Sequence, residues 1–160
     1  MMRIGLGYDI HSLAYERKLF IGGIAIRYIK GLLGHSDADV LLHALCDALL
    51  GAISEGDIGE HFPDTDPKYL GISSTELLKL VLKLVSKKKY SICNIDVVII
   101  AQEPGMSPFK KKIQENLANI LEIDKDCVSI KAKTNEGMGE VGRKEAIACY
   151  AVALLRRVNL

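Results

Sequence analysis

The amino-acid sequence predicts one layered domain of mixed helices and strands, an α/β (α+β) fold. Segments in which apolar residues alternate with polar ones, as in strands, interleave with segments of helical period. The chain has 160 residues, 49% of them hydrophobic and 26% charged, which suffices for one ordinary core but not for two. It contains no internal repeat, low-complexity stretch or linker, so residues 1–160 are expected to form a single domain.

The charge balance and the apolar pattern exclude two classes of partner. Lys and Arg number 21 against 20 Asp and Glu, a net charge of +1, so the chain lacks the positive field that holds a nucleic-acid backbone. No apolar run approaches the ~18 residues of a membrane span, and Asp9 and His11 interrupt the start before a signal-peptide core could form. We expect a complete cytoplasmic protein that binds neither nucleic acid nor membrane. The cysteines lie far apart, mostly in apolar runs, and are expected to be small hydrophobic side chains instead of disulfides or zinc ligands: Cys46, Cys93, Cys127 and Cys149.

The chain opens with two segments of strand-like pattern. In residues 3–11, larger apolar side chains alternate with small or polar ones, which is the period of a half-buried strand. Asp9 and His11 would then share one face of this strand and could bind one ion. Residues 19–26 are typical of a hairpin arm with glycines at its bend, and residues 30–34 are expected to lead into a loop.

Residues 38–53 form the clearest helix. Their apolar side chains recur at helical spacing, and Ser36 and Asp37 precede them as capping candidates. Residues 56–71 are rich in glycine, proline and acidic residues and are too long for a mere connection, so they are a candidate functional loop. A second helix is expected over residues 73–89.

The remaining segments include an ambiguous one at the end of the chain. Residues 95–101 and 128–133 favour strands, and residues 108–122 favour an amphipathic helix. In residues 146–158, Ala and Leu favour a helix, whereas the even positions could equally line one face of a strand. Propensity alone favours a helix there.

The clearest helix contains a candidate metal ligand. His43 lies four residues after Asp39 and four before Asp47, so the three side chains project from neighbouring turns of one face. A carboxylate one turn away can hold the other N–H of the imidazole and fix the tautomer that a metal requires. A solvated polar stripe is the alternative interpretation. Together with Asp9 and His11, His43 would give two imidazoles and one carboxylate, which suit Zn²⁺ with one coordination position left open for catalysis.

Two further segments carry polar groups that could act on a ligand. His35, Ser36 and Asp37 either form a catalytic loop or cap the helix, and the sequence slightly favours the cap. Residues 131–143 are expected to run from a strand into a glycine-rich turn. The main-chain N–H groups of such a turn suit a phosphate ester, together with a hydroxyl, an arginine and a carboxylate that could bind Mg²⁺. This turn has neither Walker nor Rossmann spacing. His61 lies in the long loop, where an exposed histidine is more often incidental.

Together, these segments resemble the family of 2-C-methyl-D-erythritol 2,4-cyclodiphosphate synthases, which act in the non-mevalonate isoprenoid pathway. The resemblance runs through nearly the whole chain, keeps the order of the family's motifs and includes Gly7-Tyr8-Asp9-Ile10-His11 and Gly34-His35-Ser36-Asp37. The matching segments are residues 3–5, 7–11, 31–40, 42–44, 47–51, 56–59, 62–67, 94–96, 100–102 and 132–134.

The resemblance implies a fold, an assembly and a reaction. The fold is a two-layer α/β sandwich with a four-stranded mixed sheet beside helices, in which residues 146–158 form a strand. Three subunits would pack their sheets around a threefold axis, so that each active site lies between two subunits of a homotrimer. The implied substrate is 4-diphosphocytidyl-2-C-methyl-D-erythritol 2-phosphate, whose 2-phosphate attacks its own β-phosphate, closes a cyclic diphosphate and expels CMP.

The resemblance also implies two metal sites. The family's metal ligands fall on Asp9, His11 and His43, where Zn²⁺ or a similar ion would take a β-phosphate oxygen as its fourth ligand and act as a Lewis acid. Glu136 matches the ligand of a Mg²⁺ or Mn²⁺ ion that bridges the diphosphate. Asp47 would orient a ligand from outside the coordination sphere.

Other matched positions imply substrate contacts. His35 and Thr134 match residues that orient or stabilise the reacting phosphates, and Ser36 would donate a hydrogen bond nearby. The remaining matched positions would contact the sugar, the cytosine or the phosphates, and are Asp57, Gly59, Asp64, Ala101, Met106, Ala132, Lys133 and Arg143.

Two departures from the family and two alternative functions remain. Gly105 stands where many members have Lys, so cytosine recognition would depend on backbone groups. Glu140 replaces an aromatic residue that lines a channel on the threefold axis, which leaves isoprenoid diphosphate binding there open. One alternative is a metal-dependent phosphohydrolase, in which the same ligands activate a water. The other is a non-enzymatic metal- or nucleotide-binding oligomer, which needs a fourth protein ligand and a closed site.

Overall fold

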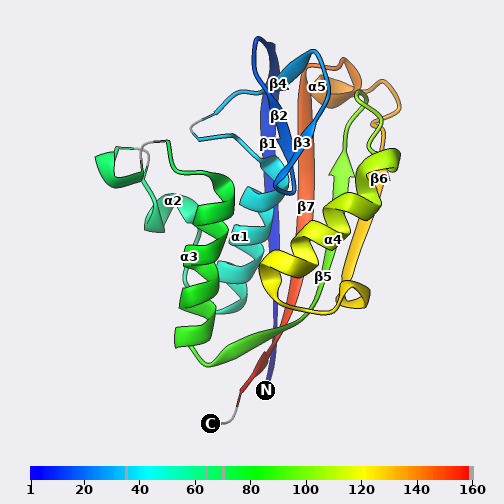
Figure 1. The fold of residues 1–160 in the computed structure, drawn as a ribbon. Coiled ribbons are helices and arrows are strands. Elements are labelled where there is room, and N and C mark those ends of the chain that lie inside the picture. Colours follow the sequence, from blue (N-terminus) through cyan, green and yellow to red (C-terminus); the bar gives the residue numbers. More distant parts are fainter. Residues whose placement is uncertain (35, 64, 70, 159–160) are drawn as a thin grey trace.

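A long twisted sheet packs against helices in the computed structural model, which describes residues 1–34, 36–63, 65–69 and 71–158 (Figure 1). The strands are β1 (Met2–Tyr15), β2 (Leu19–Ile21), β3 (Ile24–Ile26), β4 (Lys30–Leu32), β5 (Tyr90–Ile100), β6 (Val128–Lys133) and β7 (Ala146–Arg157). The helices are α1 (Val40–Ala52), α2 (Ile58–His61), α3 (Ser74–Lys87), α4 (Lys110–Leu121) and α5 (Gly139–Gly142). The predicted layered fold of helices and strands is confirmed.

The main sheet is mixed, with the strand order β4-β1-β7-β5-β6. Strand β7 pairs antiparallel with β1 on one side and with β5 on the other, and β5 runs parallel to β6. The resemblance implied four strands, and the count is wrong by one. The fifth strand, β4, pairs antiparallel with the last residues of β1, Leu13 to Tyr15, on the edge of β1 opposite to β7.

The C-terminal segment is the strand β7 at the centre of the sheet. Its Ala and Leu residues favour a helix when isolated, but pairing with strands on both sides overrides this propensity. Ile147, Cys149 and Ala151 are fully buried under the helices, whereas Tyr150 points to the opposite face and is 42% exposed. The strand that the resemblance implied for this segment is therefore confirmed.

Strand β1 and helix α1 touch backbone to backbone. A Cβ atom added to Gly5 would lie 1.9 Å from the carbonyl oxygen of Ala48, and one added to Gly7 would lie 1.8 Å from that of Ala44. Any larger residue at these two glycines would push the helix away. This close approach brings the C-terminal half of β1 within side-chain reach of α1.

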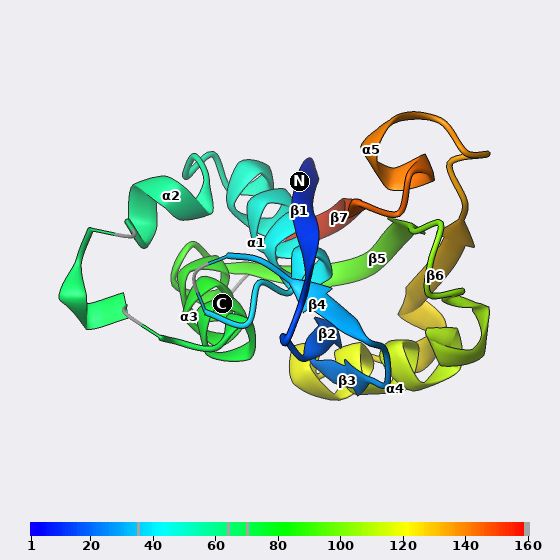
Figure 2. The same ribbon diagram turned by 90° about the horizontal axis from the view of Figure 1, so that it is seen from above.

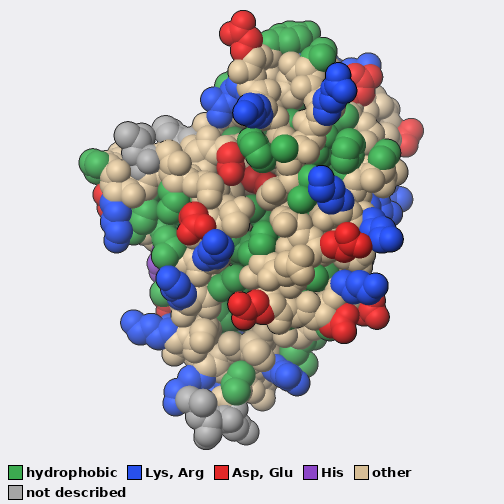
Figure 3. Space-filling view, in the orientation of Figure 1, with side chains coloured by type: hydrophobic (Ala, Val, Ile, Leu, Met, Phe, Trp, Pro, Cys, Tyr) green, Lys and Arg blue, Asp and Glu red, His purple; other side chains and the backbone are tan. Residues whose placement is uncertain are grey.

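The two faces of the sheet differ in what covers them. Helices α1, α3 and α4 cover one face, on which acidic and basic side chains are interspersed at the surface (Figure 3). Helix α5 covers one end of the opposite face through Val141. Elsewhere that face exposes a row of large apolar side chains: Met2, Ile4, Leu6, Tyr8, Ile10 and Tyr150. A face of this kind is typical of a subunit interface.

The segment that carries α2 projects sideways beyond α1 and α3, as the view from above shows (Figure 2). Its main anchor on α1 is Asp47, whose Oδ1 accepts a hydrogen bond of 2.8 Å from the N–H of Ile58. Among the described residues, no helix is both long and apolar enough to cross a membrane. The structure leaves all four cysteines as free thiols.

Candidate active site

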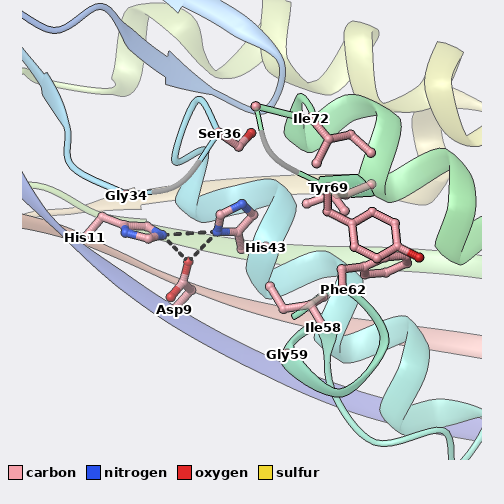
Figure 4. Close-up of a pocket in the computed structure, with 12 residues that line it drawn as sticks. Asp9, His11, Gly34, Ser36, His43, Ile58, Gly59, Phe62, Tyr69 and Ile72 are labelled. Atoms are coloured by element: carbon pink, nitrogen blue, oxygen red, sulfur yellow. Dashed lines mark hydrogen bonds and ion pairs between the residues drawn. The ribbon is translucent and has the colours of Figure 1, made fainter. Parts of the chain in front are cut away.

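Three metal-binding side chains meet where strand β1 passes helix α1. Asp9 and His11 are alternate residues of β1 and share the face that looks toward α1, which contributes His43. Asp9 Oδ2 lies 2.8 Å from His11 Nε2 and 3.1 Å from His43 Nδ1, and these two ring nitrogens are 3.1 Å apart. The three donor atoms converge on one another (Figure 4). The structure thus brings together the trio that the sequence singled out.

The donor atoms of this trio fit a divalent metal such as zinc. Tetrahedral zinc with bonds of about 2.0–2.1 Å separates neighbouring donors by about 3.3 Å, close to the distances found here. The outer ring nitrogens have partners of their own, because His11 Nδ1 lies 2.9 Å from Leu33 O and His43 Nε2 lies 2.9 Å from Ser74 Oγ. With the N–H protons on these outer nitrogens, the inner nitrogens present lone pairs to an ion.

The three side chains of the trio would fill three of the four positions of a tetrahedral ion. Within the described residues, which do not include His35, no fourth Asp, Glu, His or Cys joins the group. The closed site that a non-enzymatic metal-binding oligomer requires is therefore not formed by this part of the chain. An open position beside a cavity is the arrangement of catalytic sites.

The histidines also determine the charge of Asp9. Burial raises the pKa of this carboxyl, but its interactions with the His11 and His43 side chains outweigh burial and lower the pKa to about 2. Burial lowers the pKa of His11, but the hydrogen bond and the charge of Asp9 outweigh it, so the pKa of His11 is raised. Asp9 is therefore ionised at neutral pH, as a metal ligand must be.

A cavity of about 270 Å³ opens beside the trio. Ser36 and Gly59 line it together with the three metal-binding side chains, and the substrate contacts assigned to these two residues stay predictions. Apart from Gly34 and Gly71, the rest of its wall consists of the larger side chains of Ile58, Phe62, Tyr69, Ile72 and Leu77, which are mainly apolar (Figure 4). Most of these residues belong to the long loop, which confirms that this loop lines a site instead of merely connecting two helices.

Ser74 is a site residue that the sequence did not reveal. It is fully buried in the first turn of α3, where its Oγ contacts both His43 Nε2 and a carboxylate oxygen of Asp37. The preceding Ser73 already caps the helix by accepting a hydrogen bond of 3.2 Å from the N–H of Glu76. Two serines at the start of a helix that needs one cap were the only signal in the sequence, and this signal is weak.

The two carboxylates that flank His43 in the helix have other partners. Asp39 is fully buried and caps α1, and it accepts hydrogen bonds of 2.7–3.1 Å from three main-chain N–H groups, those of Gly22, Gly23 and Leu42. Asp47 anchors α2 through Ile58. The outer nitrogen of His43 contacts Ser74 of α3 and not Asp47, so the orienting role expected of Asp47 stays a prediction.

Of the remaining substrate contacts predicted in the loops beside the cavity, the structure describes only Asp57. Asp57 caps α2 by accepting a hydrogen bond of 3.0 Å from the N–H of Glu60. His35 and Asp64 lie outside the described residues. Their assigned contacts stay predictions.

The predicted nucleotide and phosphate contacts form a second group across the sheet, near the ends of β5 and β6 and beside α5 (Figure 1). They are Ala101, Met106, Ala132, Lys133, Thr134, Glu136 and Arg143. In this group the N–H of Ala101 donates to Lys133 O at 2.9 Å, and Thr134 Oγ1 donates to Glu136 Oε1 at 3.0 Å. The described residues that line the cavity include none of this group. Within one chain, this group of residues therefore lies apart from the cavity beside the trio.

Comparison with protein sequences finds one family over almost the full length of the chain. Residues 2–156 match the YgbB family. A relative from Syntrophotalea carbinolica is 55% identical over 157 residues, covering 98% of this chain and 96% of the relative. A relative from Clostridium perfringens is 55% identical over 154 residues, with 96% and 99% coverage. Both relatives are named 2-C-methyl-D-erythritol 2,4-cyclodiphosphate synthase.

Solved structures show the same fold. The CDP complex of IspF from Plasmodium falciparum matches with a TM-score of 0.87 and 39% identity, covering 99% of this chain and 97% of that one. The bifunctional IspDF from Campylobacter jejuni matches with a TM-score of 0.95 and 40% identity over 99% of this chain. This chain spans 43% of that longer protein.

Proposed function

This chain belongs to the YgbB family, whose relatives above are 2-C-methyl-D-erythritol 2,4-cyclodiphosphate synthases, and we propose that it carries out their reaction. The substrate is 4-diphosphocytidyl-2-C-methyl-D-erythritol 2-phosphate, and the products are the 2,4-cyclodiphosphate and CMP. The enzyme is a phosphorus–oxygen lyase of isoprenoid precursor biosynthesis. The observation that carries this proposal is the trio of Asp9, His11 and His43, open toward a cavity. The four free thiols suit the cytoplasm as the place of the reaction.

The trio is the proposed holder of Zn²⁺ or a similar ion. A metal bound there supplies Lewis-acid polarisation of a β-phosphate oxygen. Asp9 contributes a negative charge to the site at neutral pH, and His11 and His43 contribute neutral ring nitrogens whose outer N–H groups are fixed by hydrogen bonds. Glu136 is the proposed ligand of Mg²⁺ or Mn²⁺ at the diphosphate.

The chain's own residues position the reacting groups. An oxygen of the 2-phosphate forms a bond to the β-phosphorus, while the bond from that phosphorus to the oxygen of CMP breaks and CMP leaves with the electron pair. Because both phosphates belong to one molecule, holding its sugar in the cavity gives the 2-phosphate a high effective concentration. The apolar side chains of Ile58, Phe62 and Ile72 keep water from competing as the nucleophile.

The proposed active site is completed by a neighbouring subunit. Ser36 and Gly59 line the cavity beside the trio, whereas Thr134 and Glu136 follow β6 and are absent from the described residues that line it. We assign these two groups, together with Asp57, to one active site shared by two subunits. A homotrimer with its sheets around a threefold axis would bury the exposed apolar row on β1 in a subunit interface. His35 and Thr134 are assigned to the reacting phosphates. Asp64, Ala101, Met106, Ala132, Lys133 and Arg143 are assigned to the rest of the substrate.

Release of CMP tests this proposal directly. Purified protein loaded with zinc and Mg²⁺ is mixed with the cytidyl substrate, and the products are separated by chromatography and identified by phosphorus NMR. We expect CMP and the cyclic diphosphate in equal amounts, and loss of both after treatment with a chelator. Loaded, folded protein that releases no CMP would refute the proposed function.

A further inference from the structure

The outer nitrogen of His43 begins a chain of hydrogen bonds that leads away from the metal-binding atoms. His43 Nε2 lies 2.9 Å from Ser74 Oγ, and Ser74 Oγ contacts Oδ1 of Asp37. Ser74 is fully buried and His43 is 8% exposed, so bulk water does not replace these contacts. In Figure 4 the outer nitrogen of His43 lies on the side of the ring away from Asp9.

The numbers of donors and acceptors determine which group donates at each step of this chain of hydrogen bonds. An ionised carboxylate only accepts, and a serine hydroxyl has a single proton. The hydroxyl of Ser74 therefore donates to Asp37, and its oxygen accepts from the Nε2–H of His43. With its proton on Nε2, the imidazole has a lone pair on Nδ1, the atom that lies 3.1 Å from Asp9 and from His11.

We propose that Ser74 and Asp37 are positioning residues that hold His43 in its metal-binding tautomer. This inference rests on the proposed metal site of Asp9, His11 and His43. In the metal-free trio, a proton on His43 Nδ1 could instead donate to Asp9 Oδ2 at 3.1 Å, and that tautomer cannot bind an ion. Ser74 disfavours this tautomer by offering an acceptor to Nε2–H, and Asp37 keeps the hydroxyl proton pointed away from His43.

The hydroxyl of Ser74 is separable from the structure of α3. The cap of this helix is Ser73, and the main-chain N–H of Ser74 donates to both carboxylate oxygens of Asp37 at 3.2 and 3.3 Å. Both features persist when Ser74 becomes alanine. The substitution Ser74→Ala therefore removes the contact to His43 while the loop around Asp37 stays attached to the helix.

Zinc affinity, measured without substrate, tests the inference. Competition with a chromophoric chelator gives the Kd of the wild type, of Ser74→Ala and of the matched control Ser73→Ala, which loses a helix cap in the same turn. We expect Ser74→Ala to bind zinc ~10–100-fold more weakly than the wild type, as is typical when the partner of a metal-binding histidine is lost. Ser73→Ala is expected to lose stability and to keep the wild-type Kd. The absorption bands of bound Co²⁺, which report ligand geometry, should change in Ser74→Ala alone.

A second variant tests the chain beyond Ser74. In Asp37→Ala, the freed hydroxyl of Ser74 can turn and donate to His43 Nε2, which stabilises the wrong tautomer, so zinc binding should weaken. Because the two residues act in series, Ser74→Ala/Asp37→Ala should bind zinc no more weakly than Ser74→Ala alone. If the double variant instead lost zinc affinity by the product of the two single losses, the two residues would not act through one chain of hydrogen bonds. If Ser74→Ala fails to fold, Asp37→Ala still tests the inference, because a wild-type Kd in folded Asp37→Ala would contradict it.

The remaining outcomes separate this inference from the proposed function. A wild-type protein that binds no zinc would overturn both the metal site and the positioning chain. Wild-type zinc binding together with equal Kd values for folded Ser74→Ala and Ser73→Ala would overturn the positioning chain alone and leave the proposed function standing.

Discussion

Gly7 of β1 lies directly against the main-chain carbonyl of Ala44 in α1, where an added Cβ atom would be 1.8 Å from the carbonyl oxygen. His43 immediately precedes Ala44, and Asp9 is the next residue after Gly7 on the same face of the strand. The distance between strand and helix therefore determines the distance between the metal-binding atoms. The contact of Gly7 with Ala44 therefore sets both the packing of β1 on α1 and the spacing of the metal-binding side chains.

Gly7→Ala should destabilise the protein, because a methyl group at this position has no space unless α1 moves. We expect a loss of at least ~2 kcal/mol in the free energy of unfolding, measured with urea, and weaker zinc binding. Gly51→Ala is the matched control, since a Cβ atom on Gly51 meets nothing within 4 Å on α1. That change should stabilise the protein by ~0.5–1 kcal/mol. Equal unfolding midpoints for the two variants would show that the strand and the helix are not in close contact.

His43→Ala should remove bound metal and activity while the protein stays folded. The packing face of α1 is built by Leu41, Leu45 and Leu49, all fully buried, and the substitution leaves these side chains in place. Zinc content by mass spectrometry, circular dichroism and CMP release are the measurements. His61→Ala is the control, because His61 bonds to the Glu55 carbonyl and should leave the zinc content unchanged. Near-normal zinc in folded His43→Ala would remove His43 from the metal site.

In the metal-free protein, Asp9 and His11 should make a pH-dependent contribution to the free energy of unfolding. The pKa of Asp9 is lowered from 3.8 to about 2, so its contribution to stability is present above 3.8 and lost as the pH falls through 2. The pKa of His11 is raised from 6.5, so its contribution is present below 6.5 and lost as the pH rises through the raised value. The two contributions to stability are therefore both present between pH 3.8 and pH 6.5.

Urea unfolding of chelator-treated protein measures this effect. The stability of the wild type relative to Asp9→Asn should be greater near pH 5 than near pH 8.5, and the opposite order would be inconsistent with the ion pair. Added zinc should stabilise the wild type more at the higher pH, because the ion must displace the proton of His11.

Co-expression of two inactive variants tests the shared site. His43→Ala and Thr134→Ala damage different half-sites, so a mixed trimer contains some sites with both residues intact. Random assembly gives about one quarter of intact sites. We expect activity of that order from the mixture and almost none from either variant alone. A mixture with no more activity than its components would show that the two groups of residues do not meet across an interface.

Local patterns in the sequence sufficed for the elements that carry the metal site. Alternation placed Asp9 and His11 on one face of a strand, and helical spacing placed His43, because these signals depend on neighbours in the chain. The C-terminal segment was ambiguous from the residues alone, since its strand depends on pairing with β1 and β5, which lie far away in sequence. The short strand β4 was missed because its three residues are too few to show alternation, and their extended form depends on pairing with β1.

The surroundings of the site were harder to predict than its ligands. Spacing suggested Asp39 and Asp47 as partners of His43, but the orientation of α1 turns the outer nitrogen toward Ser74, a residue 31 positions along the chain. Such a contact depends on how two helices pack, which periodicity does not report. The resemblance alone assigned the second group of residues, and its union with the first in one active site is part of the proposed homotrimer.

The source of the oxygen in the new phosphorus–oxygen bond tests the central claim most directly. The reaction is run in heavy-oxygen water with zinc and Mg²⁺ present, and the products are weighed by mass spectrometry. If the tethered 2-phosphate is the nucleophile, CMP and the cyclic diphosphate will both form without solvent label. Label in CMP or in a linear phosphate product would identify water as the nucleophile and would make the protein a metal-dependent phosphohydrolase.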